Sequence, residues 1–310
     1  MPRHSVTING SEPKKASAVQ PFDYARPTTV DEAVKLLASE DARALAGGTD
    51  IIPDLREGRR DAKRLVDIKH IPELVAIERD PAGGWRVGAA ASIGSLGRHE
   101  PFAAENAGLI EAAQLIGSLQ IQARATLGGN LCTATPSGDA LPLLVSLGCE
   151  AEIAGASGRR MLAVGDVVNA PRRTSLGRGE LVTAFFIPPA PPRFAARYLR
   201  FTPRREMDIA VAGSGVALAL NPLGEVASVR ITLASVAPVP LQAKRAEARL
   251  MGTKPGPDDL REAASLAARD AAPISDTRAS ADYRRHLAEV LTRRALEACL
   301  AEIANREGQR

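Results

Sequence analysis

Two short segments of this chain place consecutive glycines directly before small polar side chains, a pattern that suits phosphate binding. They are residues 45–51 (LAGGTDI) and residues 126–130 (TLGGN). Glycine lets backbone N–H groups approach an anion closely, and the missing P-loop lysine disfavours a nucleoside triphosphate with magnesium. One Gly-Gly pair alone is more often a tight turn, but two such segments in one chain favour the pyrophosphate of a dinucleotide.

A run of small residues follows the second segment and ends in the carboxylate of Asp139 (CTATPSGD, residues 132–139). Asp139 could accept a hydrogen bond from a ribose or ribityl hydroxyl, or it could cap a helix over residues 140–147. Both interpretations stay open, because its two oxygens could serve different partners.

A third glycine-containing segment, residues 212–218 (AGSGVAL), resembles the start of a dinucleotide-binding fingerprint but lacks its third glycine. It continues as a strand where the fingerprint requires a helix, so close packing of the backbone is the better interpretation. The four histidines are isolated, and no serine lies in a GxSxG motif. The sequence therefore predicts no catalytic residue and no metal site, and a bound cofactor would have to supply any redox chemistry.

The first glycine segment is expected to connect a strand to a helix in a small unit of about residues 21–75. Thr29 and Glu32 have the spacing of a capping box, and apolar residues at helical spacing follow Thr29, which predicts a helix there. Strands are expected over residues 43–46 and 64–68, with a short helix over residues 51–56.

The second glycine segment is expected in a larger unit of about residues 76–192. A hairpin of strands 75–78 and 85–87 opens it, and apolar spacing predicts a helix over residues 109–116. Glycines at 128 and 129 are expected to break the helical pattern, and strands follow. Four prolines between 188 and 192 can neither join a strand ladder nor continue a helix, so they mark the predicted domain boundary.

Residues 193–305 are expected to form a third unit. A long strand over 209–220 and a return strand around 229–233 predict an antiparallel hairpin. Helices over 244–251, 258–271 and 283–305 complete the unit. Cys299 follows the apolar spacing of the last helix, which predicts a core residue and not a reactive thiol.

Composition narrows the function classes. The chain has 310 residues, of which 45% are hydrophobic, and this is enough for a large core in two or three domains. Its net charge of +4 is spread along the chain, which disfavours a nucleic-acid-binding protein. No apolar run approaches the ~20 residues that cross a bilayer, and residues 1–20 read as a disordered lead-in without a signal core, so we expect a cytoplasmic protein. Three cysteines without a CxxC pair argue against an iron–sulfur cluster in this chain.

With Ala134, Pro136 and Asp139, the two glycine segments resemble the FAD-binding motifs of the xanthine dehydrogenase and carbon monoxide dehydrogenase family of molybdenum hydroxylases. The chain is similar to the separate FAD-binding medium subunit of that family from about residue 22 to the last helix. The resemblance implies an α+β fold. A vanillyl-alcohol-oxidase (PCMH)-type FAD-binding domain of two subdomains, residues 21–192, would precede a C-terminal antiparallel sheet with a helical bundle, residues 193–305.

The resemblance also implies which residues bind FAD. The glycine segments would surround the pyrophosphate, Asp139 would bind a sugar or ribityl hydroxyl, and Arg200 takes a position near the flavin ring that is often a lysine. The implied cofactor-binding residues are Leu45, Ala46, Gly47, Gly48, Thr49, Asp50, Ile51, Ile116, Thr126, Gly128, Gly129, Asn130, Thr133, Ala134, Asp139, Val182 and Arg200.

By the same resemblance the chain is an oxidoreductase subunit that transfers electrons. Its FAD would receive them from a small two-iron two-sulfur subunit, beside a large molybdenum-cofactor subunit, and pass them to an external acceptor, in a dimer of heterotrimers. A stand-alone FAD-dependent reductase of the same cofactor fold is the alternative. Five arginines are candidates for a partner contact or the flavin pocket, with a solvated strand face as the alternative: Arg193, Arg197, Arg200, Arg204 and Arg205.

Overall fold

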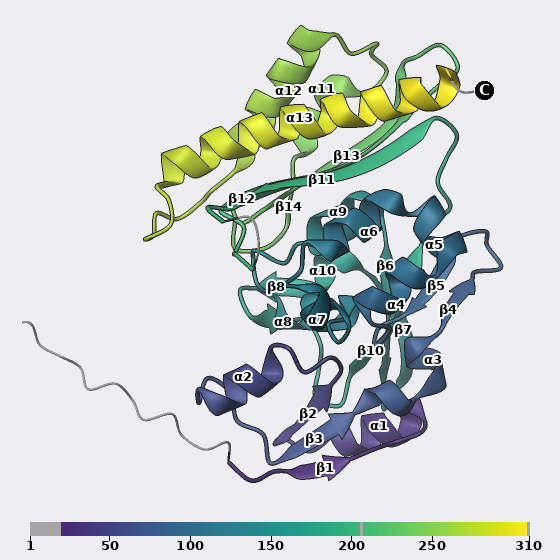
Figure 1. The fold of residues 1–310 in the computed structure, drawn as a ribbon, viewed down its shortest axis with the longest axis vertical. Helices are drawn as coiled ribbons and strands as arrows, with labels where there is room; N and C mark the ends of the chain where they lie inside the picture. Colours follow the sequence, from purple (N-terminus) through teal and green to yellow (C-terminus); the bar gives the residue numbers. More distant parts are fainter. Residues whose placement is uncertain (1–19, 205–206, 309–310) are drawn as a thin grey trace, which may run out of the picture.

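The computed structural model describes residues 20–204 and 207–308 and arranges them in three stacked units (Figure 1). A small parallel sheet lies at one end, a five-stranded antiparallel sheet with most of the helices lies in the middle, and a four-stranded antiparallel sheet with three helices lies at the other end. The expected disorder of residues 1–20 falls almost wholly outside the described residues.

The first unit is a three-stranded parallel sheet in the order β1–β3–β2. The predicted N-cap is confirmed, because the Thr29 hydroxyl accepts a hydrogen bond from the Glu32 N–H at 3.3 Å. The Glu32 carboxylate accepts its bond, at 3.0 Å, from the N–H of Thr28 and not from that of Thr29, so the second half of the capping box is displaced by one residue. The elements are β1 (Asp23–Ala25), α1 (Val30–Leu37), β2 (Ala42–Leu45), α2 (Ile51–Arg56), β3 (Arg64–Asp67), a 3-10 turn (Ile68–His70) and α3 (Pro72–Val75).

The middle unit is an antiparallel sheet in the order β4–β5–β10–β6–β7, packed against short helices around buried Trp85, Phe102 and Phe185. Its strands are β4 (Ile77–Arg79), β5 (Trp85–Gly88), β6 (Glu150–Gly155), β7 (Gly158–Ala163) and β10 (Leu181–Ile187), with a separate ribbon of β8 (Val168–Ala170) and β9 (Arg173–Thr174). Its helices are α4 (Ile93–Arg98), α5 (Glu100–Glu105), α6 (Ala107–Gln114), α7 (Leu119–Gln122), α8 (Leu127–Thr133), α9 (Leu141–Ser146) and α10 (Val164–Val167).

Three expectations for this unit need correction. The hairpin begins at Ile77, because the preceding residues form the helix α3. Helix α6 ends at Gln114, so Ile116 lies beyond it. The glycines at 128 and 129 do not end a helix but lie inside α8, because the Thr126 side chain caps that helix by accepting a hydrogen bond from the Gly129 N–H at 2.9 Å.

The third unit is an antiparallel sheet in the order β11–β12–β13–β14, with helices on one face (Figure 1). Helices α6 and α9 of the middle unit contact its strands as well. Cys299 is fully buried in α13, which confirms it as a core residue. The elements are β11 (Phe194–Phe201), β12 (Ala212–Leu220), β13 (Val226–Ala234), β14 (Leu241–Gln242), α11 (Lys244–Leu250), α12 (Pro257–Asp270) and α13 (Ala281–Gly308).

The sequence analysis missed strand β11 and started β12 three residues too early. It correctly placed the 212–218 segment in a strand: a Cβ at Gly213 would lie 2.5 Å from the Tyr198 hydroxyl on β11, and one at Gly215 would lie 2.9 Å from the Pro142 backbone. These glycines therefore permit close packing. The four prolines lie between β10 and β11, and the domain limits at 192 and 193 stay a prediction.

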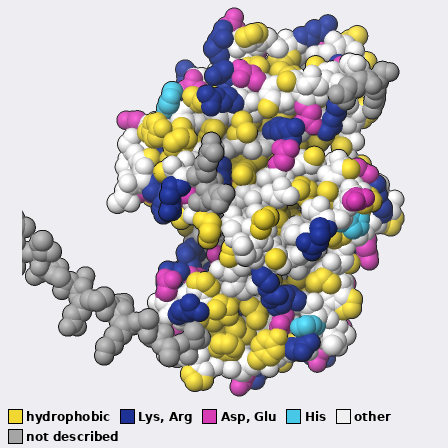
Figure 2. Space-filling view, in the orientation of Figure 1, with side chains coloured by type: hydrophobic (Ala, Val, Ile, Leu, Met, Phe, Trp, Pro, Cys, Tyr) yellow, Lys and Arg dark blue, Asp and Glu magenta, His cyan; other side chains and the backbone are white. Residues whose placement is uncertain are grey.

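The surface agrees with the dispersed charge of the sequence. In Figure 2, Lys and Arg side chains are scattered over the visible face and interspersed with Asp and Glu. Within the described ranges, every helix is either too short or too polar to cross a membrane.

Candidate functional site

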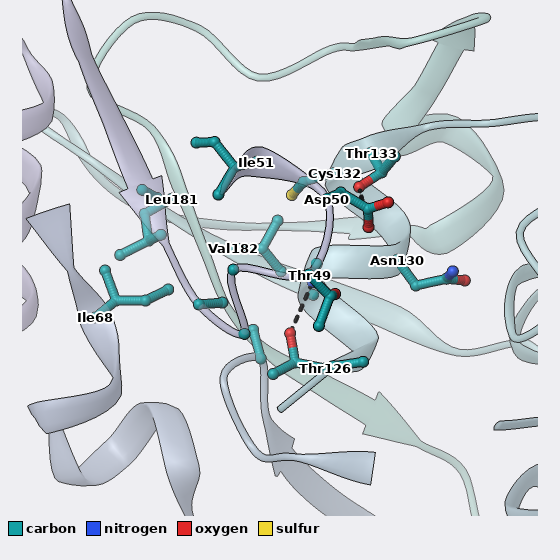
Figure 3. Close-up of a pocket in the computed structure, with 18 of the residues that line it drawn as sticks. Thr49, Asp50, Ile51, Ile68, Thr126, Asn130, Cys132, Thr133, Leu181 and Val182 are labelled. Carbon is teal, nitrogen blue, oxygen red and sulfur yellow. Dashed lines mark hydrogen bonds between the residues drawn. The ribbon is translucent and has the colours of Figure 1, made fainter. Parts of the chain in front are cut away.

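A pocket lies where the turn between β2 and α2 meets helix α8, so the structure brings the two glycine segments together (Figure 3). The Thr133 hydroxyl, at the end of α8, donates a hydrogen bond to the Asp50 carboxylate at 3.2 Å and so links the two segments. In Figure 3, Ile68 and Leu181 lie on one side of the view, and Asp50 and Thr133 lie on the other. The pocket therefore combines an apolar part with a polar part.

The first glycine segment lines this pocket with backbone amides that the protein leaves unpaired. Within residues 20–204 and 207–308, no acceptor receives a hydrogen bond from the N–H groups of residues 47–51. Gly48 has φ +83°, a conformation that side chains with a Cβ rarely adopt. Consecutive amides without a protein acceptor, beside a residue with positive φ, are the elements from which an anion-binding nest is built.

The second glycine segment differs from the first because its backbone amides have acceptors within the chain. The Gly128 N–H donates to the Ala89 carbonyl at 3.1 Å, and the Gly129 N–H donates to the Thr126 hydroxyl. A Cβ at Gly128 would lie 2.5 Å from the Ala89 carbonyl oxygen, so this glycine lets α8 pack on the backbone after β5. The two glycine segments, which the sequence predicted to bind one pyrophosphate together, therefore differ, since the Gly128 and Gly129 amides are already paired within the chain.

The two segments also touch through their backbones. A Cβ at Gly47 would lie 2.2 Å from the Arg124 carbonyl oxygen, just before the second segment. The Oδ1 atom of Asn130, in α8, is buried without a donor among the described residues, so the chain leaves an acceptor that a polar ligand group could satisfy. Open amides, an orphan acceptor and small apolar walls together fit a dinucleotide.

Most residues predicted to bind the cofactor line this pocket, and Leu45, Ala134, Asp139 and Arg200 do not. Leu45 lies in β2 just before the glycine turn. Ala134 is fully buried in a left-handed conformation at the end of α8. The binding roles of all the predicted residues stay predictions.

Asp139 lies away from the pocket lining, in a buried cluster that joins the middle and third units. Its carboxylate accepts hydrogen bonds from the Tyr198 hydroxyl at 3.0 Å and from the Arg200 guanidinium at 2.5 Å. Burial raises the pKa of Asp139 to about 6, although Arg200 and Tyr198 both favour the ionised form. Asp139 does not cap α9, because Ala140 takes the N-cap position and the helix has no side-chain cap.

The pocket also contains residues that the sequence analysis did not single out. Ala125, Cys132 and Leu181 are sequence neighbours of predicted residues, and that adjacency could have found them. Ala89 and Arg60 come from segments that carried no signal. Burial raises the pKa of the Cys132 thiol to about 11, so the thiol stays neutral. The additional lining residues are Ala44, Arg60, Ile68, Ala89, Ala125, Cys132 and Leu181.

The four candidate arginines that the structure describes do not gather at the pocket. Arg193 pairs with Glu307, and Arg197 contacts Glu111 and Glu302, each at 2.8 Å. Arg204 pairs with Asp208 at 3.3 Å, and Arg205 lies outside the described residues. Arg200 is engaged by Asp139, so each described member of the set is compensated within the chain.

Comparisons with known proteins extend over nearly the whole chain. A family model described as the FAD binding domain in molybdopterin dehydrogenase matches residues 20–190, and one described as the CO dehydrogenase flavoprotein C-terminal domain matches residues 197–299. The carbon monoxide dehydrogenase medium chain of Afipia carboxidovorans is 35% identical over 92% of this chain and 98% of its own length. A putative xanthine dehydrogenase FAD-binding subunit of Escherichia coli is 29% identical, over 90% and 97%.

Solved structures are also similar to this chain over nearly its whole length. A chain of the Cu,Mo-CO dehydrogenase superposes with a TM-score of 0.87 at 34% identity and covers 92% of this chain and 99% of its own length. A chain of quinoline 2-oxidoreductase from Pseudomonas putida superposes with a TM-score of 0.86 at 26% identity, over 93% and 99%.

Proposed function

The chain belongs to the flavoprotein family of the molybdopterin dehydrogenases and binds FAD, and from this premise we propose that it is the electron-transfer subunit of a molybdenum hydroxylase complex. Membership confirms the resemblance on which the sequence analysis relied, and with it the α+β fold of a FAD-binding domain followed by an antiparallel sheet with helices.

The residues of the pocket fit FAD. The open amides of residues 47–51 hold the phosphate oxygens, and Thr126, Asn130 and Thr133 offer polar contacts along α8. Ile116 and Val182 provide apolar walls that exclude water from the flavin. Bound FAD supplies the one- and two-electron redox chemistry that the protein side chains lack.

The run of open amides is the single observation that carries the proposal, because consecutive unpaired amides in a pocket with apolar walls suit an anionic cofactor. The cysteines support a further chain as the electron donor. Cys132, Cys149 and Cys299 are free and far apart in the sequence, and the described residues contain no group of side chains that could ligate a metal. If the flavin receives its electrons from an iron–sulfur cluster, another chain therefore holds that cluster.

We therefore propose a small two-iron two-sulfur subunit as the electron donor, a large molybdenum-cofactor subunit beside it, and a dimer of heterotrimers as the assembly. The relatives support partners in general, because their names describe medium chains and subunits of larger enzymes. The external acceptor receives the electrons last. A cytoplasmic location stays a prediction.

Purification of the tagged chain from its native host tests this function. We expect FAD, and not FMN, to be released on denaturation, and two further subunits that contain iron and molybdenum to co-purify. A fully flavinated chain that elutes alone and reduces a small substrate without iron or molybdenum would replace the proposal with a stand-alone reductase.

A further inference from the structure

Helix α2 holds a buried carboxylate that contacts three arginines at once. The Asp54 side chain is only 5% exposed, and it pairs with Arg59 at 2.8 Å, Arg60 at 3.1 Å and Arg172 at 2.5 Å. We call these four residues the Asp54 cluster. Glu57 also pairs with Arg59, but two carboxylates cannot neutralise three guanidinium groups. The cluster therefore carries an excess positive charge.

The arginines of the Asp54 cluster differ in where they lie relative to the cofactor pocket. Arg60 lines the pocket, whereas Arg59 and Arg172 do not. Among the described residues that line it, Arg60 has the only cationic side chain, and Asp50 has the only other charged one. The pyrophosphate of FAD carries two negative charges, which amides can solvate but not neutralise. A cation in the pocket would therefore stabilise the bound pyrophosphate beyond what the amides provide, and Arg60 is the residue that can supply it.

The guanidinium of Arg60 has N–H donors that Asp54 does not use. Its Nε atom makes the contact with Asp54, and within the described residues its two terminal nitrogens have no acceptor. A guanidinium carries five N–H donors in a planar fork, so one edge can remain on Asp54 while the other faces a phosphate. Asp54 thus orients the Arg60 guanidinium and leaves its other N–H donors available for a ligand.

Two further contacts fix the place of Arg60. The Asp54 carbonyl accepts hydrogen bonds from the backbone N–H groups of Arg59 at 2.8 Å and Arg60 at 3.3 Å, so the chain folds back over the end of α2. Arg172 reaches Asp54 from the turn between β8 and β9, and its N–H donates to the Ala134 carbonyl, at the end of α8, at 2.7 Å. The Asp54 cluster therefore ties α2 to α8 on either side of the pocket.

We propose that Arg60 is a cofactor-binding residue whose guanidinium compensates the phosphate charge of FAD, and that Asp54 and Arg172 are positioning residues that hold it there. The inference rests on the proposed function, because it requires FAD in this pocket. The inference adds a cationic side chain to the proposed FAD site, whose two glycine segments contain no cationic residue.

The test is the affinity of the full-length chain, freed of flavin, for FAD at low and at high salt. Arg60→Gln should weaken binding about 10- to 100-fold, the loss of a charge-assisted hydrogen bond, and should flatten the salt dependence of binding. Arg60→Lys should keep most of the salt dependence, because it keeps the charge. Arg59→Gln is the matched control: it removes a neighbouring partner of Asp54 that does not line the pocket, and it should bind FAD like the wild type.

Unchanged affinity and salt dependence in Arg60→Gln would overturn the proposal, and so would an equal loss in Arg59→Gln, which would assign the effect to the Asp54 pairs. Thermal melting of each flavin-free variant separates lost binding from lost folding. If Arg60→Gln does not fold, Arg60→Met, which also removes the charge, takes its place: weaker binding with a flattened salt dependence supports the inference, and unchanged binding refutes it. A wild-type chain that binds no FAD at either salt concentration refutes the proposed function itself.

Discussion

Replacing Gly47 by alanine is the sharpest test of how the two glycine segments make one site. The added Cβ would lie 2.2 Å from the carbonyl oxygen and 2.7 Å from the carbonyl carbon of Arg124, whereas ordinary contacts begin at 3.4 Å. Because both partners are backbone, no side chain can rotate away. The two segments must separate by about 1 Å, at a cost of about 1–3 kcal/mol in overpacking.

The same displacement moves the open amides that face the cofactor. Hydrogen bonds weaken steeply once donor and acceptor separate by a further ångström, so we expect Gly47→Ala to lower FAD affinity at least ~10-fold. A glycine outside the pocket is the control. Gly58 also has a positive φ, +65°, and a Cβ there would meet nothing within 4 Å, so its cost is the left-handed strain of about 1–2 kcal/mol.

The assay is the ratio of flavin to protein after gel filtration, followed by titration of the flavin-free chain with FAD and by thermal melting. Gly47→Ala should lose flavin, and Gly58→Ala should lower the melting temperature while it retains its flavin. Full flavin content in Gly47→Ala would refute the argument, as would equal flavin loss in both variants.

Three further outcomes follow from particular contacts. Gly128→Ala, whose Cβ would meet backbone at 2.5 Å, should lower flavin content more than Gly129→Ala, whose Cβ would meet only a hydroxyl at 3.1 Å. Burial raises the pKa of Asp139 to about 6, so between pH about 4 and about 6 the folded chain holds a proton that the unfolded chain releases. The free energy of unfolding, measured with urea, should therefore fall as the pH rises from about 4 to about 6. In Asp139→Asn this free energy should depend less on pH. Ser146→Ala should cost about 1–3 kcal/mol in the same assay, because the buried Ser146 hydroxyl lies 2.9 Å from that of Thr232 and 3.0 Å from the Gly215 carbonyl.

Local signals in the sequence predicted the part of the site that one segment builds by itself. The capping residues at Thr29 and Glu32 located α1, and the glycine segment predicted the connection from β2 to α2 with the correct bounds for that helix. Such features depend on neighbours three or four residues away, which the sequence displays directly.

Features that depend on distant partners were not predictable in the same way. Gly128 and Gly129 looked like a second phosphate loop, but pairing with Ala89 and Thr126 makes them part of a helix. Strand β11 was missed because arginines interrupt its apolar alternation, and the acidic residues that compensate them lie on other elements. Arg60 carried no signal, since its place at the pocket depends on a carboxylate six residues earlier and a helix far along the chain.

The sheet of β11 to β14 is covered by its own helices on one face and contacted by α6 and α9 of the middle unit. Gly215 packs directly against the start of α9, and α9 closes a buried polar contact with β13. A chimera that exchanged only residues 193–308 between relatives would therefore cut through a core and not through a linker. Exchange of modules in this family should succeed only when α6 and α9 are exchanged with the sheet on which they pack.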